Sequence, residues 1–221
     1  MSRRRLAIAV VAVVLLVAAL GLGALAWQRW SPPRSRLILA DSDLALTGVS
    51  RPWRWIVVHH SATVSDTVDA MDREHRNKRG WDGIGYHFVI GNGKGQPLGE
   101  IRATWRWLDQ REGAHAGIAD YNQAGIGICL VGDCERNAPP SQQIERLAWL
   151  CANLIRLQPG LLPRPAVRLP QPEDHLAAII GHRDVPGKAT KCPGVHCDLR
   201  ALRCRVAELL APPAVTSATP P

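Results

Sequence analysis

Two short apolar runs, far apart in the chain, each lead into histidine. Trp55–His60 is β-branched and aromatic in character, and residues 177–181 lead directly into His182. Such runs are typical of strands buried on both faces of a sheet, and side chains at the ends of buried strands emerge at its rim. These runs therefore constrain the chain to a sheet that presents imidazole groups at an edge.

The rest of the chain alternates predicted strands with predicted helices. A helix capped within Ser65-Asp66-Thr67 runs to about Arg79, and further helices begin at Ser141 and span 198–210. Further strands are predicted at 84–90, 96–101 and 126–131, with a turn at 91–95. This alternation predicts an α/β fold, a single domain with a central mixed β-sheet flanked by helices. A phosphate-binding loop is not expected, because the glycines of 91–95 lack a Lys-Ser/Thr pair and a following helix.

An apolar run near the N-terminus predicts export. Leu6–Trp27 is long enough to form a transmembrane helix, and Arg3, Arg4 and Arg5 before it hold that end in the cytoplasm. The alternative is a cleaved secretory signal with a small-residue site at Ala24-Leu25-Ala26. Under the first reading the protein is membrane-anchored, under the second it is secreted, and both place the remainder in the periplasm or another extracytoplasmic space.

Composition divides the chain into four parts. Residues 1–27 form the anchor, 28–52 a linker, 53–210 the folded domain and 211–221 a disordered tail rich in proline, serine and threonine. The net charge of +8 and the pI near 9.7 favour an anionic partner. Nucleic acid is not expected, because the export signal separates the chain from it, whereas a wall polymer with carboxylates fits both charge and location.

The histidines and a cysteine suggest a catalytic metal site. His59 and His60 point to opposite faces of a strand, so only one of them is expected to bind the same metal as His182, and spacing does not choose between them. Cys192 follows His182 by ten positions. Two imidazoles and a thiolate are suited to zinc with an open fourth position, as in catalytic rather than structural sites. With Cys192 on zinc, an odd number of the six cysteines remains, and no disulfide pairing is predicted.

Five blocks of sequence together resemble a known family. They are Val57–Thr63, Gly80–Phe88, Gly113–Ala116, Tyr121–Gly132 without 123–124, and Gly181–Val185 followed by Lys191–Gly194. In this order they are similar to the type-2 N-acetylmuramoyl-L-alanine amidases, a family shared with phage amidase lysozymes and peptidoglycan recognition proteins. The resemblance covers about residues 53–210 and implies the amidase fold.

The resemblance also implies roles for individual residues. It makes His59, His182 and Cys192 the ligands of Zn²⁺, and it places Tyr86 beside the metal as a donor to the scissile carbonyl oxygen. His115 and Asn122 match positions that line the substrate groove. Where some members carry a glutamate, this chain has Cys129, and where others carry a lysine it has Thr190, which is expected to orient water or substrate.

The expected function is therefore a zinc-dependent amidase of peptidoglycan or muropeptides. It would hydrolyse the amide between N-acetylmuramic acid and L-alanine of the stem peptide. Two alternatives remain, a non-catalytic module that binds peptidoglycan and an interaction protein whose metal site is vestigial. The presence of Cys192 argues against the first alternative, because members of the family that lose hydrolysis typically lack this ligand.

Overall fold

The structure is a computed structural model that describes residues 51–157 and 176–211. The predicted transmembrane helix over Leu6–Trp27, nearly all of the linker and most of the tail lie outside these residues. Within the described part of the chain, no helix combines the length and the apolar character needed to cross a membrane.

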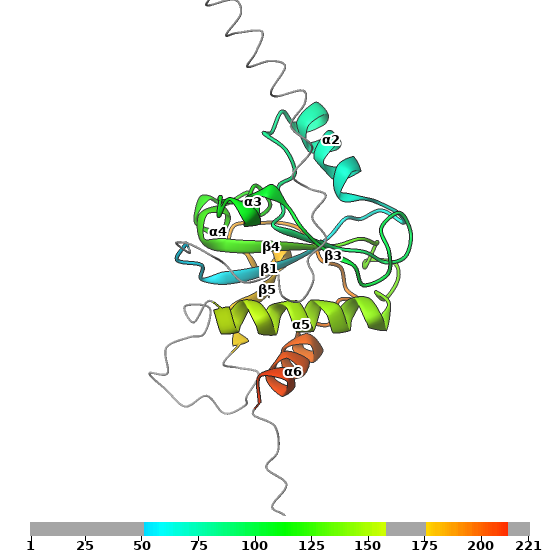
Figure 1. Cartoon of the computed structure of the whole chain (residues 1–221), viewed down its shortest axis with the longest axis vertical. Coiled ribbons are helices and arrows are strands. Elements are labelled where there is room, and N and C mark those ends of the chain that lie inside the picture. Colours follow the sequence, from blue (N-terminus) through cyan, green and yellow to red (C-terminus); the bar gives the residue numbers. More distant parts are fainter. Residues whose placement is uncertain (1–50, 158–175, 212–221) are drawn as a thin grey trace, which may run out of the picture. The chain divides into compact units, whose positions relative to one another are not determined.

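The described residues form one mixed sheet with helices around it (Figure 1). The strands are β1 (Trp55–His60), β2 (Phe88–Ile90), β3 (Ile101–Ala103), β4 (Gly125–Leu130) and β5 (Ile179–Gly181). The helices are α2 (Val68–Arg79), α3 (Trp105–Leu108), α4 (Ala119–Ala124), α5 (Ser141–Leu157) and α6 (Leu199–Leu210), and the 3-10 turn η5 (His182–Asp184) follows β5. The predicted mixed sheet flanked by helices is confirmed.

The strand order is β3-β2-β4-β1-β5. β2, β4, β1 and β5 are mutually parallel, and only the edge strand β3 is antiparallel to its neighbour. Parallel strands have their carboxyl ends at the same edge of the sheet, where α/β proteins usually bind ligands. The ends of β1 and β5 therefore meet, and with them the histidines that follow the two apolar runs.

Apolar side chains fill both faces of the sheet. The larger core lies between the sheet and α5 and α6, and it includes Ile56, Ile128 and Leu154. A smaller core with Val68 and Met71 of α2 covers the opposite face. Figure 1 shows α5 along one face of the sheet and α2 on the other side. All-round burial explains why β1 and β4 are continuous apolar runs rather than alternating ones.

Two predicted strands are shorter or shifted. β2 begins at Phe88 rather than at 84, because the backbone before it bonds to other groups: Gly85 N–H donates to Nδ1 of His75. The strand predicted at 96–101 is β3 at Ile101–Ala103. Before it, the Gln96 side chain donates to the carbonyls of Val89 and Glu100, so side-chain bonds replace a strand ladder there. The short helices α3 and α4 were not predicted.

Candidate functional site

The three predicted metal ligands converge at the carboxyl edge of the sheet. His59 lies at the end of β1, His182 directly follows β5, and Cys192 lies in the loop after η5. Their candidate ligand atoms are all within 4.8 Å of one another, and Cys192 Sγ is 3.7 Å from His59 Nδ1. His59 is buried, whereas His182 and Cys192 are partly exposed, so the cluster is open toward solvent on one side.

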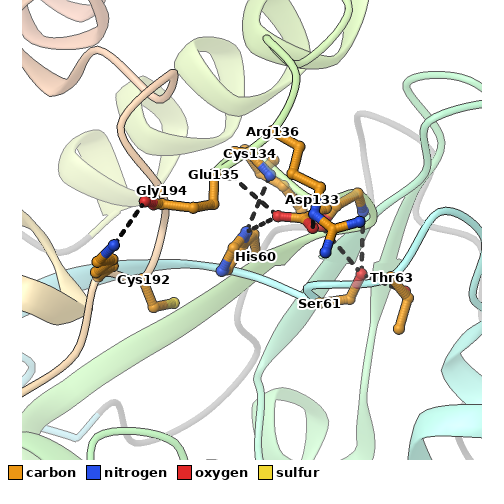
Figure 2. A network of polar contacts seen from close by, with 12 residues as sticks. His60, Ser61, Thr63, Asp133, Cys134, Glu135, Arg136, Cys192 and Gly194 are labelled. Carbon is orange, nitrogen blue, oxygen red and sulfur yellow. Dashed lines mark hydrogen bonds and ion pairs between the residues drawn. The ribbon is translucent and has the colours of Figure 1, made fainter.

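His60 is directed away from this cluster. Its Nδ1 accepts a hydrogen bond from the Cys134 backbone N–H at 3.0 Å and lies 3.9 Å from Asp133 Oδ1. Figure 2 shows the ring among the residues of the loop that follows β4. The strand therefore separates the two histidines as expected, and the structure places His59 beside His182, a choice that spacing left open.

A chain of hydrogen bonds fixes the tautomer of His59. The Gly125 carbonyl can only accept, so the 3.1 Å contact with His115 Nε2 requires a proton on that nitrogen. His115 Nδ1 then accepts from His59 Nε2 at 3.0 Å. His59 Nδ1 is left with its lone pair, and this is the atom that faces Cys192 Sγ.

His182 is oriented in the same way. Its Nε2 lies 3.2 Å from the Ala116 carbonyl oxygen, so it donates there and Nδ1 keeps the lone pair. Burial lowers the pKa of His182. Burial also lowers the pKa of His59 well below 6.5, and the nearby His115 and His182 lower the pKa of His59 further. Neutral imidazoles are the form in which histidine binds metals.

The geometry of the cluster fits zinc. Tetrahedral coordination with ordinary zinc–nitrogen and zinc–sulfur bonds would place the two ligand atoms about 3.6 Å apart. The observed separation between Cys192 Sγ and His59 Nδ1 is 3.7 Å. Two lone-pair nitrogens and one sulfur, with one open side, match the ligand set of a catalytic zinc site.

Arg183 of η5 holds the loop that carries Cys192. Arg183 N–H donates to the Cys192 carbonyl at 2.7 Å, and the Arg183 guanidinium donates to the Gly194 carbonyl at 2.7 Å. Burial raises the pKa of the Cys192 thiol to about 12, opposed by a hydrogen bond from the His60 backbone. A metal cation is the charge that would stabilise the thiolate in this pocket.

Tyr86 lies beside the cluster, and its role as a donor to substrate stays a prediction. Its ring centroid is 5.1 Å from that of His59. Burial, together with Cys129, raises the pKa of the Tyr86 phenol well above 10, so it remains a protonated donor at neutral pH. The Tyr86 phenol donates a hydrogen bond to the sulfur of Cys129. Cys129 is fully buried, and on β4 it pairs in register with His59 of β1.

A buried arginine supports the segment that carries Tyr86. Arg106 donates to the carbonyls of Ile84 and Glu112 and forms an ion pair with Asp82. This role could not be predicted from the sequence, because an arginine in a short helix gives no signal of its partners. Arg183 was missed for the same reason, although it stands next to His182.

The other predicted site residues form hydrogen bonds with the cluster or with the backbone next to it. Thr190 Oγ1 accepts from the Cys192 N–H at 3.2 Å, which leaves its own hydroxyl proton free to donate. His115 is only 7% exposed and both of its ring nitrogens are already bonded within the protein. Asn122 Oδ1 accepts from the backbone. The substrate contacts expected for His115 and Asn122 remain predictions; in this structure His115 bonds His59, and Asn122 bonds the backbone of residues 115 and 116.

The fold and the site together define an α/β domain with a candidate metal centre at the carboxyl edge of a mixed sheet. A family model described as N-acetylmuramoyl-L-alanine amidase matches residues 49–195. That match covers more than half of the chain, and the chain belongs to this family.

Named relatives agree with this assignment. Peptidoglycan-recognition protein LB of Drosophila melanogaster is 34% identical over 152 residues, covering 65% of this chain and 55% of that protein. N-acetylmuramoyl-L-alanine amidase of Sus scrofa is 29% identical over 161 residues, covering 65% of this chain and 22% of that protein. This chain thus spans only part of the length of these curated relatives.

A solved structure shares the fold. N-acetylmuramoyl-L-alanine amidase LysC from Clostridium intestinale URNW superposes with a TM-score of 0.50 at 24% identity, covering 72% of this chain and 90% of that one. The structural likeness concerns the arrangement of the backbone, and the site has to be argued from the residues of this chain.

Proposed function

We propose that this protein is a zinc-dependent N-acetylmuramoyl-L-alanine amidase. The observation that carries the proposal is the convergence of His59, His182 and Cys192, whose ligand atoms lie within 4.8 Å of one another, with the Nε2 atom of each histidine bonded elsewhere and two of the three residues partly exposed. A zinc ion held there would supply Lewis-acid chemistry, activating water and polarising the scissile carbonyl. Membership of the amidase family indicates which bond would be hydrolysed, the amide between N-acetylmuramic acid and L-alanine.

Two protein groups have proposed roles in the reaction. The Tyr86 phenol, kept protonated by its surroundings, donates to the carbonyl oxygen as negative charge develops on it. To do so it must turn its proton from Cys129 to the substrate. Thr190 is fixed by the Cys192 N–H and directs its hydroxyl proton toward water or substrate.

The proposed location is outside the cytoplasm. Arg3–Arg5 and the apolar run Leu6–Trp27 support an N-terminal membrane anchor with the amidase domain on the far side. Peptidoglycan or its muropeptide fragments are the partners that fit this location, the basic charge and the names of the relatives.

Mass spectrometry of muropeptides incubated with the full chain in detergent tests the proposal. Release of free stem peptide, abolished by a chelator and restored by Zn²⁺, is the expected result. Cys192→Ser is the matched variant, because it replaces one sulfur by oxygen and should lose most of the bound zinc by elemental analysis. A wild-type protein that binds zinc and muropeptide but releases no peptide would instead be a recognition module. A protein that binds neither would have a vestigial site.

A further inference from the structure

We propose that Asn122 is a positioning residue that sets the tautomers of both histidines in the metal site. It does so by holding one short segment, residues 115–116, which provides the hydrogen-bond acceptor for each of them. The inference rests on the metal-binding part of the proposed function, and it assigns to Asn122 a role other than contact with substrate.

The amide oxygen of Asn122 bonds two consecutive backbone groups. Oδ1 accepts from the His115 N–H at 3.0 Å and from the Ala116 N–H at 2.8 Å. In addition, the Asn122 carbonyl accepts from the Gly113 N–H at 2.9 Å. Asn122 of α4 therefore holds both residues of the segment and also the backbone just before it, at Gly113.

Each residue of that segment contacts a different histidine. His115 Nδ1 accepts from His59 Nε2 at 3.0 Å, and the Ala116 carbonyl accepts from His182 Nε2 at 3.2 Å. Each contact leaves Nδ1 of the histidine as the nitrogen with a free lone pair. A shift of the segment would loosen both contacts at once, because the two acceptors are adjacent in the chain.

Close packing makes the His115 contact sensitive to position. A Cβ on Gly127 of β4 would lie 2.4 Å from Cδ2 of His115, so the ring rests directly on the strand backbone. His115 also has its Nε2 bound to the Gly125 carbonyl of the same strand. The ring is thus held on one side by β4, and Asn122 holds the backbone from which it extends.

Outer hydrogen-bond partners of metal-binding histidines fix ring orientation and basicity, and their loss typically lowers metal affinity roughly 10- to 100-fold. Asn122→Leu keeps much of the side-chain shape but removes the acceptor for two N–H groups. We expect the full-length variant to bind Zn²⁺ at least about 10-fold more weakly than wild type in a chelator competition at pH 7.5.

Two matched variants separate positioning from general damage. Asn122→Asp retains an oxygen that accepts from both N–H groups, and it should restore zinc affinity close to that of wild type. Gln123→Leu removes an amide from the neighbouring, exposed position of the same helix and should leave affinity unchanged. If Asn122→Asp binds zinc as weakly as Asn122→Leu, or if Asn122→Leu binds it as tightly as wild type, the proposal is wrong.

The histidine tautomers give a readout that needs neither metal nor activity. Long-range ¹H–¹⁵N spectra of the metal-free wild-type protein should show His59 and His182 protonated on Nε2, with mixed tautomers appearing in Asn122→Leu. A wild-type proton on Nδ1 of either histidine overturns the proposal even if the leucine variant does not fold. A wild-type protein that shows these tautomers but binds no zinc would refute the proposed function while leaving the orienting bonds in place.

Discussion

At the scale of single residues, burial favours the neutral form of the imidazoles in and around the site. His87 shows the pattern away from the metal cluster: Nδ1 accepts from the Gly127 N–H at 2.9 Å, and Nε2 donates to the Arg111 carbonyl at 3.0 Å. It is fully buried, and burial lowers its pKa well below 6.5. Protonation would place a charge in the core and oppose the bond from Gly127.

This arrangement predicts how stability depends on pH. Below pH 6.5 the unfolded chain takes up a proton at His87 that the folded protein refuses, so the free energy of unfolding is largest above pH 6.5 and falls as the pH decreases toward the folded pKa. The loss is about 1.4 kcal/mol for each unit by which the pKa is lowered. Urea unfolding of metal-free protein at pH 7.5 and 5.0 measures it. Other buried histidines contribute to the same dependence, so His87→Gln should reduce it by the share of His87, whereas His196→Gln at an exposed position should leave it unchanged. An equal reduction by both variants would contradict the explanation.

A second prediction at this scale concerns Tyr86. Tyr86→Phe should retain zinc, because the phenol is not a ligand, but should lower the turnover of a muramoyl-peptide roughly 10²–10³-fold through loss of one donor to the oxyanion. Steady-state kinetics with metal analysis of the same sample checks both parts. Unchanged turnover would leave Tyr86 as a packing residue against His59.

At the scale of elements, α2 shows how local sequence positions the site. Thr67 caps its start by accepting from the Ala70 N–H, and Gly80 ends it with a left-handed backbone at φ 66°. From within the helix, His75 accepts from the Gly85 N–H and so holds the segment that leads to Tyr86. The correct termination of α2 therefore affects the position of the phenol.

The C-terminal cap of α2 can be tested by substitution. A Cβ on Gly80 would meet no atom within 4 Å, so Gly80→Ala has only the backbone conformation to oppose it. We expect a loss of about 1 kcal/mol in the free energy of unfolding. Gly80→Asn should lose less, because asparagine tolerates this conformation. Thermal or urea unfolding compares the two, and equal stability of the alanine variant and wild type would contradict the assignment.

At the scale of the whole molecule, the sequence before the domain predicts its location. Sequencing of the N-terminus of the mature protein should find the initial residues retained, which would keep the domain near the membrane through the linker over 28–52. A new N-terminus at Trp27 would show instead that the protein is released. Complete protection of the domain from protease added to intact spheroplasts would contradict export itself.

Much of the fold could be predicted from local patterns. The apolar runs located β1, β4 and β5, and the residues at Thr67, Gly80 and Asp198 marked helix ends, because burial and capping depend on neighbouring residues. The five ordered blocks then pointed to the family and to His59, His182 and Cys192. Local sequence was a poor guide to β2 and β3, whose backbone groups are bonded by distant or side-chain partners.

Only the tertiary structure decided how the site is supported. The period of the strand shows only that His59 and His60 point to opposite faces, and the resemblance to the family selected His59. The folded chain shows the reason, because His182 and Cys192 lie on the His59 side of β1, whereas His60 contacts the loop after β4. Likewise, His115 contacts His59 and Asn122 bonds the backbone of His115, because the segment that carries them packs against Gly125 and Gly127 of β4. The sequence by itself determined which residues can bind a metal. The orientation of the two histidines depends on hydrogen bonds between residues 56 and 66 positions apart, which only the folded chain brings together.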